Sequence, residues 1–258
     1  MNLSLELRRG TVRFAGPRRL FHRPEPAVLA LDDVSLKICR GECWGLVGES
    51  GSGKTTLAYA LAQLQKLDSG TVLLNGTPAR SIPRRAFCRR VQLVFQSPQD
   101  ALNPRRSVGQ TLREPLNLHF PGRDRRWREE RVEELLAAVQ LPAQLRDSFP
   151  ENLSGGQRQR VAIARSLAVE PEFLICDEVV SALDSAIREE IVQLLRRTRD
   201  SHRLGMLFIA HDLPLVGQLC SHVAILQNGR LVERGEAAAI LAGPATEHGR
   251  ELLRDSIC

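Results

Sequence analysis

The hydrophobic and polar residues of the first third of the chain follow two periods, one after the other. Residues 29–39 alternate between apolar and polar side chains, and after a short turn an apolar run ends at Gly48. Beyond the following glycines, Leu57, Leu61 and Leu64 stand at the spacing that places side chains on one stripe of a helix. This order predicts two strands and a helix, with a glycine-rich turn before the helix.

The middle of the chain has a helical pattern, and the strand pattern returns after it. We expect a mostly helical segment over residues 97–154, inserted into an α/β core made of residues 1–96 and 155–258. Strands that alternate with helices favour a mostly parallel sheet, whose ligands bind at the carboxyl ends of the strands. Particular expectations are an amphipathic helix with Val132, Leu135, Leu136 and Val139 on its apolar side, a helix from Gly155, strands over 173–176 and 206–210, helices over 186–199 and 213–220, and tight turns at Asn75-Gly76 and Asn228-Gly229.

The charge of the chain is basic, with a net charge of +6, which invites a nucleic-acid interpretation. Its arginines are scattered from end to end, and the densest runs, over residues 84–90 and 123–131, are not built around rows of aromatic side chains that stack on bases. We therefore interpret these runs as solvated faces. The six cysteines show no metal-ligand spacing, and no apolar run approaches the roughly 20 residues of a membrane-spanning helix, so we expect a cytosolic protein.

A phosphate-binding loop follows the apolar strand that ends at Gly48. The segment "GESGSGKT" fits the pattern G-x-x-x-x-G-K-[ST], and it stands between a buried strand and a helix, as this motif requires. Backbone N–H groups of such a loop point at phosphate oxygens, Lys54 supplies a positive charge, and the Thr55 hydroxyl binds Mg²⁺. The predicted nucleotide-binding residues of the loop are Gly48, Glu49, Ser50, Gly51, Ser52, Gly53, Lys54, Thr55 and Thr56.

Polar residues at the ends of three later strands complete a candidate catalytic site. In "FLICDE", Asp177 is expected to hold Mg²⁺ through water, and Glu178 to polarise an attacking water. Gln96 ends "VQLVFQ" and is expected to reach both Mg²⁺ and that water. His211 ends "MLFIAH" and is expected to hold the γ-phosphate. The sequence thus predicts an ATP- and Mg²⁺-dependent hydrolase, with Thr55, Gln96 and Asp177 at the metal.

A second glycine-rich turn, "LSGGQ" over residues 153–157, stands about a hundred residues after the first. With this turn about twenty residues before "FLICDE", the chain resembles the nucleotide-binding subunits of ABC transporters over residues 14–234. The resemblance implies an ATPase with a P-loop, RecA-like α/β core, N-terminal antiparallel strands and an inserted helical subdomain. An ordinary P-loop kinase would have no use for the second turn.

The same resemblance implies how the two turns work. Two subunits of this family pair head to tail, and Ser154, Gly155, Gly156 and Gln157 of one subunit then contact the nucleotide on the other. "SALD", which ends at Asp184, resembles the loop that crosses the dimer interface. Phe14 stands where the family has an aromatic residue that stacks on adenine.

The subunit type is also suggested by resemblance. "VFQSPQDALNPRRSVGQTLREPL" is similar to the peptide/nickel uptake family, in which this region meets the membrane subunits, so residues 103–106 are expected to contact them. The chain ends without the cysteine-rich and "PYT" segments of many peptide-import subunits, and Val179 replaces a frequent Pro. We therefore expect import of nickel or a metal chelate, with di- or oligopeptides as the alternative.

The resemblance also implies the partners and location of the chain. The expected partners are a second ATPase subunit, which makes a heterodimer, two permease subunits and an extracytoplasmic solute-binding protein, with no nucleic acid. The expected place is the cytoplasmic face of a bacterial inner membrane. A less favoured alternative is a soluble ABC ATPase that acts on nucleic acid, since that class usually carries coiled coils, zinc modules or tandem cassettes.

Overall fold

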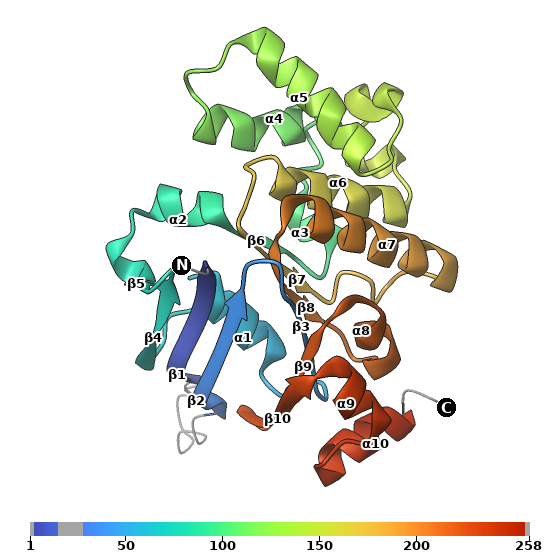
Figure 1. Cartoon of the computed structure of the whole chain (residues 1–258). Helices are drawn as coiled ribbons and strands as arrows, with labels where there is room; N and C mark the ends of the chain where they lie inside the picture. Colours follow the sequence, from blue (N-terminus) through green and yellow to red (C-terminus); the bar gives the residue numbers. More distant parts are fainter. Residues whose placement is uncertain (1–2, 15–27, 256–258) are drawn as a thin grey trace, which may run out of the picture. The chain divides into compact units, whose positions relative to one another are not determined.

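The computed structural model describes residues 3–14 and 28–255 (Figure 1). Two compact units can be distinguished within these residues. The first is made of residues 1–82 together with 205–258, and the second of residues 83–204.

The first unit begins with an antiparallel sheet, as expected. Its strand order is β2-β1-β4-β5, and Figure 1 shows β1, β2 and β4 side by side. In β2, buried and exposed positions alternate because only one face of this strand packs on the core. The strands are β1 (Ser4–Phe14), β2 (Val28–Cys39), β4 (Ser69–Leu74) and β5 (Thr77–Pro78).

The first unit also contains the parallel strands that lead to the phosphate-binding loop. Strand β3 (Cys43–Val47) lies between β8 (Gly205–Ile209) and β9 (His222–Gln227), parallel to both. β9 turns back into β10 (Arg230–Glu236) through the predicted hairpin. Both turn residues have positive φ angles, 48° at Asn228 and 77° at Gly229, as a two-residue turn of this type requires.

One prediction about the helix after this loop is wrong. The helix α1 (Lys54–Leu61) ends before Leu64, whose side chain is 49% exposed, whereas Leu57 and Leu61 are fully buried. The chain leaves the helix at Gln63, which takes a left-handed φ of 58°, and Leu64 therefore no longer follows the helical stripe. The remaining helices of the unit are η1 (Ala79–Ser81), α8 (Leu213–Leu219), α9 (Ala237–Ala242) and α10 (Glu247–Asp255).

The second unit combines two parallel strands with most of the helices. Strand β6 (Val91–Val94) pairs with β7 (Phe173–Asp177), all of whose residues are buried. Along the chain, the expected helical segment comes after β6 and before β7. The helices of the unit are α2 (Arg84–Arg90), α3 (Pro98–Ala101), α4 (Val108–His119), α5 (Arg125–Ala138), η2 (Ala143–Asp147), η3 (Pro150–Asn152), α6 (Gly155–Leu167) and α7 (Ser185–His202).

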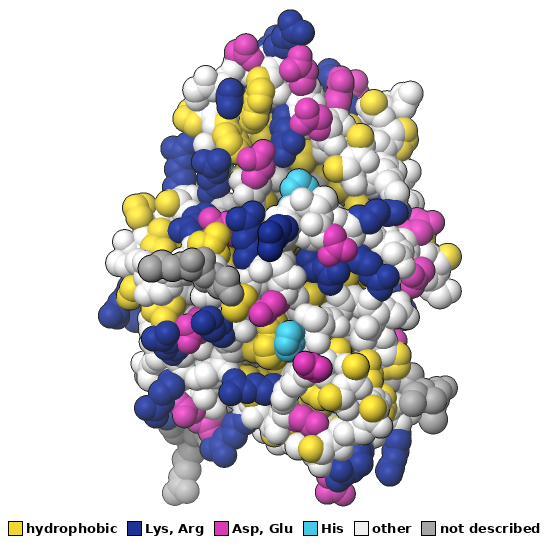
Figure 2. All heavy atoms as spheres, in the orientation of Figure 1, with side chains coloured by type: hydrophobic (Ala, Val, Ile, Leu, Met, Phe, Trp, Pro, Cys, Tyr) yellow, Lys and Arg dark blue, Asp and Glu magenta, His cyan; other side chains and the backbone are white. Residues whose placement is uncertain are grey.

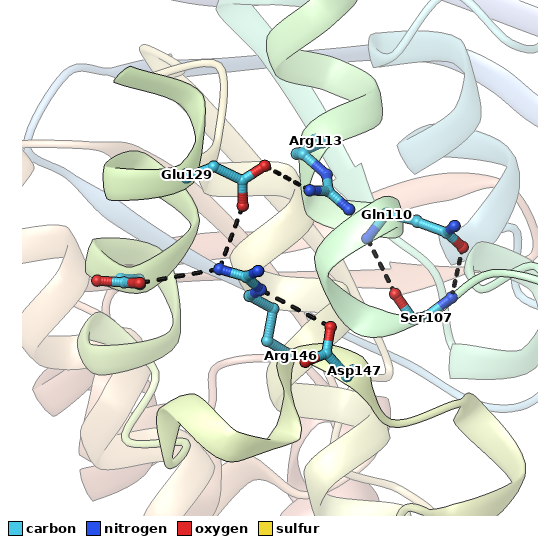
Figure 3. Close-up of polar contacts among 7 residues, drawn as sticks. Ser107, Gln110, Arg113, Glu129, Arg146 and Asp147 are labelled. Atoms are coloured by element: carbon cyan, nitrogen blue, oxygen red, sulfur yellow. Dashed lines mark hydrogen bonds and ion pairs between the residues drawn. The ribbon is translucent and has the colours of Figure 1, made fainter. Parts of the chain in front are cut away.

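Apolar packing and ion pairs together hold the helical segment. The four predicted apolar residues of α5 and its end, Val132 to Val139, are buried, which confirms the amphipathic helix. On the polar side, Glu129 of α5 lies between Arg113 of α4 and Arg146 of η2 and pairs with both (Figure 3). Buried apolar side chains thus hold α5 on one side, and the ion pairs of Glu129 connect it to α4 and η2 on the other. The division of the chain at residues 97 and 154 stays a prediction.

Candidate functional site

The first glycine-rich loop has the backbone that its sequence predicts. Gly48, Gly51 and Gly53 have φ angles of 155°, 79° and 109°. A Cβ atom on Gly48 would lie 2.2 Å from the carbonyl oxygen of Leu226, and one on Gly53 would lie 2.2 Å from that of Ala30. Because backbone oxygens cannot move away as a flexible side chain can, these two positions require glycine.

Lys54 lies at the centre of this loop. Its Nζ atom donates hydrogen bonds of 2.8 Å to the carbonyl oxygens of Gly48 and Glu49, and the side chain is buried. The hydroxyl of Ser52 is also buried and has no hydrogen-bond partner among the described residues. A fixed ammonium group and an unsatisfied hydroxyl inside a glycine-rich loop suit the phosphates of a nucleotide. Ser50, Gly51 and Thr55 lie exposed beside them, and Thr56 is partly exposed.

Two further predicted residues of the first unit lie exposed at strand ends. Phe14 is the last residue of β1, and its ring is available for contact with a flat ligand. His211 follows β8 directly. The neighbouring Asp212 caps α8, since its Oδ1 atom accepts a hydrogen bond of 3.0 Å from the amide of Leu215. This cap fixes the start of the helix that follows His211.

The second unit brings three predicted residues together. Asp177 is the last residue of β7 and is almost fully buried. Glu178 follows it in a left-handed conformation, with φ at 48°, which non-glycine residues rarely adopt. Its Oε2 atom accepts a hydrogen bond of 2.7 Å from Nε2 of Gln96, which stands just beyond the neighbouring strand β6. The pairing of β6 with β7 explains this contact, which the sequence alone did not predict.

The left-handed turn at Glu178 is supported from the next residues. The hydroxyl of Ser181 donates a hydrogen bond of 2.9 Å to the carbonyl oxygen of Glu178, and Val179 and Val180 are buried. Strained backbone of this kind persists only where the surroundings hold it, and it is common at active sites. Asp184 then caps α7 by accepting a hydrogen bond of 3.0 Å from the amide of Ile187.

The second glycine-rich turn forms the start of α6. The Ser154 Oγ atom accepts a 3.2 Å hydrogen bond from the amide of Gln157, whose side-chain oxygen accepts one of 2.9 Å from the Ser154 amide. This reciprocal cap leaves the hydroxyl proton of Ser154 available for donation. The amides of Gly155 and Gly156 precede the first hydrogen bond within the helix, so they can face an anion.

The two glycines of this turn have different surroundings. A Cβ atom on Gly156 would lie 2.6 Å from the Cγ2 atom of Ile187 on α7, so the absence of a side chain lets the two helices meet. A Cβ atom on Gly155 would meet only Leu183, at 3.9 Å. Gly155 is therefore not required by packing, and its place next to an exposed serine leaves room for a ligand.

Basic side chains are mixed with acidic ones rather than gathered. On the face that Figure 2 shows, the dark blue side chains of Lys and Arg are interspersed with magenta Asp and Glu. In the run at 123–131, Arg126 pairs with Glu130, and Arg131 pairs with Glu134 and Glu170. In the run at 84–90, Arg90 pairs with Glu172.

Comparisons with known proteins agree with this geometry. The family model of the ABC transporter matches residues 31–181, more than half of the 258 residues. A Brucella abortus protein named "Putative peptide import ATP-binding protein" is 45% identical over 92% of this chain and 73% of its own length. The oligopeptide transport ATP-binding protein OppF of Bacillus subtilis is 39% identical over 90% of this chain and 78% of its own length.

A solved structure shares the fold. The ATP-binding cassette MJ0796, determined as a dimer in a post-hydrolysis state bound to ADP and Pi, superposes with a TM-score of 0.78 and 27% identity, covering 90% of this chain and 98% of the other. The expected α/β fold with N-terminal antiparallel strands and inserted helices is thereby confirmed. With its ATP-binding loop and its second glycine turn in one polypeptide, the chain belongs to the ABC transporter family as an ATP-binding, ATP-hydrolysing subunit.

Proposed function

We propose that this chain powers the import of peptides through separate membrane subunits, by hydrolysing ATP in a head-to-tail dimer. One observation supports this proposal above the others. A single chain carries both a loop built around Lys54 and a capped serine-glycine turn at the start of α6. The two are expected to contact different nucleotides, one on this subunit and one on its partner.

The loop residues 48–56 would hold the phosphates through amide N–H groups, the Lys54 ammonium and the Ser52 hydroxyl. Phe14 would stack on the adenine ring. Oxygen and hydroxyl ligands suit Mg²⁺, and Thr55, Gln96 and Asp177 are its candidate ligands. When bound, Mg²⁺ would neutralise charge on the β- and γ-phosphates.

Glu178 is the candidate general base. Because Gln96 donates to one carboxylate oxygen, the amide fixes the side-chain orientation of Glu178, and the carboxylate retains lone pairs for a water proton. His211, beyond β8, would donate to the γ-phosphate. Asp184 would lie at the dimer interface, on the loop that begins α7.

Ser154 offers the first test of the dimer. Replacing Ser154 by alanine should lower ATP turnover of the assembled dimer by about 10²-fold, because one donor to the developing phosphate charge is lost. ATP affinity of the isolated chain should stay the same, because the turn serves the partner's nucleotide. Steady-state hydrolysis and equilibrium ATP binding are the two measurements.

Ser107→Ala is the matched control for this variant. Ser107 caps α4 with Gln110 through the same reciprocal pair of hydrogen bonds, at 3.3 and 2.9 Å, away from the turn. Both variants should lose about 1 kcal/mol of stability to the missing cap. Only Ser154→Ala should lose turnover, and a large drop in ATP affinity of the isolated Ser154→Ala chain would contradict the shared site.

The names of the relatives support peptides as the cargo. The Brucella and Bacillus proteins above are both named for peptide transport. Nickel or metal-chelate import, the main expectation of the sequence, has no such support in those names. The peptide alternative of the sequence analysis is therefore the better proposal, while the contact of residues 103–106 with a permease remains part of it.

The proposal places the chain at the cytoplasmic face of a bacterial membrane. Within the part of the chain that the structure describes, no helix combines the length and apolar character needed to cross a bilayer. Two permease subunits, an extracytoplasmic binding protein and a second ATPase subunit, which makes the dimer a heterodimer, would complete the transporter. A nucleic-acid partner is not proposed, since Arg90, Arg126 and Arg131 of the basic runs pair with acidic side chains and the runs lack rows of stacking aromatic residues.

The cargo can be tested in the assembled transporter. In liposomes that contain the permeases, the sister ATPase and the binding protein, oligopeptides should stimulate ATP hydrolysis, and Ni²⁺ should not. Duplex DNA added to the soluble chain is a control and should leave hydrolysis unchanged. Stimulation by Ni²⁺ alone would restore the nickel assignment, and stimulation by DNA would favour the nucleic-acid alternative.

A further inference from the structure

A buried histidine lies beside the phosphate-binding loop without a hydrogen bond. His248 of α10 is 5% exposed, and neither ring nitrogen has a hydrogen-bond partner among the described residues. Its Nδ1 atom lies 3.9 Å from Oε1 of Glu49 and 3.8 Å from Oε2 of Glu251. An unsatisfied ring between two carboxylates is costly when it is neutral, and it is matched to them when it is protonated.

Glu49 places a negative charge next to the proposed phosphate site. It is the second residue of the loop, its side chain is 70% exposed, and its carbonyl oxygen accepts a hydrogen bond from Lys54. ATP carries about four negative charges, and a free carboxylate within this loop would repel them. A positive charge that holds the carboxylate aside would remove part of this repulsion.

The helix that carries His248 is anchored to the rest of its unit. The Glu233 carboxylate of β10 accepts hydrogen bonds from the amides of Ala245 and Thr246 and from the Thr246 hydroxyl, at 2.8, 3.0 and 2.6 Å. Although partial burial opposes it, these bonds lower the pKa of Glu233 below its ordinary value, so the anchor remains ionised at neutral pH. The position of His248 is therefore set by the fold, not by a mobile tail.

We propose that His248 is a positioning residue that pairs with the Glu49 carboxylate and holds it away from the phosphates of bound ATP. This inference rests on the proposed nucleotide function of the loop. Among the described residues, the carboxylates within 4 Å of the His248 ring are those of Glu49 from the loop and Glu251 from α10. The helix α8, which packs on α10, contributes no charged side chain of its own.

Replacing His248 by asparagine should weaken ATP binding of the purified full chain by about three- to tenfold at low salt, since the freed carboxylate repels the phosphates. The same replacement in a Glu49→Gln background should change the affinity by less than about twofold. The probe is a fluorescent ATP analogue, titrated at two salt concentrations. The loss should shrink at high salt and should be smaller for ADP and smallest for AMP.

A second measurement avoids the buried position. Glu49 is exposed, so Glu49→Gln does not disturb the core. Glu49→Gln alone should strengthen ATP binding at low salt by less than about twofold, because His248 already holds the wild-type carboxylate aside. Glu251→Gln separates the contribution of the other neighbour.

Two results would overturn the inference. One is an equal loss from His248→Asn with and without Glu49→Gln, which would mean that His248 acts by packing. The other is a loss from His248→Asn that is the same at both salt concentrations, which would exclude an effect of charge. Failure of the wild-type chain to bind ATP at all would instead overturn the proposed function.

Discussion

The Glu178→Gln variant should bind ATP as tightly as the wild-type chain but hydrolyse it at least about 10²-fold more slowly. Glutamine has nearly the same shape, and its side-chain oxygen can still accept the hydrogen bond from Gln96. It has no proton-accepting carboxylate, so the attacking water loses its base. Because ATP then remains bound at both nucleotide sites of the dimer, the variant should accumulate as a closed dimer. Size-exclusion chromatography in the presence of ATP would detect this dimer.

Glu134→Gln is a suitable control for this experiment. Like Glu178, Glu134 accepts a hydrogen bond from a side chain of its own unit, in this case Arg131. Glu134 lies on α5, however, and its side chain is 64% exposed. Its replacement should leave hydrolysis close to the wild-type rate. If Glu178→Gln also hydrolysed ATP at that rate, Glu178 could not be the base, and the left-handed backbone at this residue would need another explanation.

The Lys54→Ala variant should lose ATP binding by at least about 10²-fold, because charge-assisted hydrogen bonds are worth about 1.5–3 kcal/mol each and Lys54 can make more than one to the phosphates. The variant also removes the Lys54 hydrogen bonds to the carbonyl oxygens of Gly48 and Glu49, although that of Glu49 still accepts one of 3.2 Å from the Ser52 amide. Isothermal titration of the purified chain with ATP measures the loss directly.

The control for this change is Lys66→Ala, which removes an exposed lysine of the same unit. It should leave both ATP affinity and the melting temperature unchanged. A melting curve of Lys54→Ala without nucleotide separates lost binding from lost folding. Tight ATP binding by a folded Lys54→Ala chain would remove the ammonium group from the phosphate site.

Local patterns were enough to predict the phosphate-binding loop and the hairpins. At Gly48, Gly51 and Gly53 the reason is local, since the loop takes positive φ angles there, which glycine adopts without strain. At Asn228-Gly229 the turn itself requires positive φ angles. Such features depend on a few neighbouring residues, so a sequence pattern contains most of the information about them.

Contacts between distant residues were not predictable in this way. The bond of Gln96 to Glu178 spans 82 positions and depends on the pairing of β6 with β7. The approach of His248 to Glu49 spans about two hundred positions, and Glu233 of β10 anchors the residues just before α10. At Leu64 the sequence pattern predicted too much. The helical spacing of leucines continues to Leu64, but the backbone leaves the helix before this residue.

The close contact of Gly156 with Ile187 has a mechanical consequence. With no side chain on Gly156, the start of α6 packs directly against Ile187, three residues after Asp184, which caps α7. The Asp184 loop and the serine turn, which are both expected to contact a neighbouring subunit, are therefore expected to move together. An alanine at residue 156 would place its Cβ atom against Ile187, and we expect it to separate the two helices and to disturb the serine turn to which it belongs.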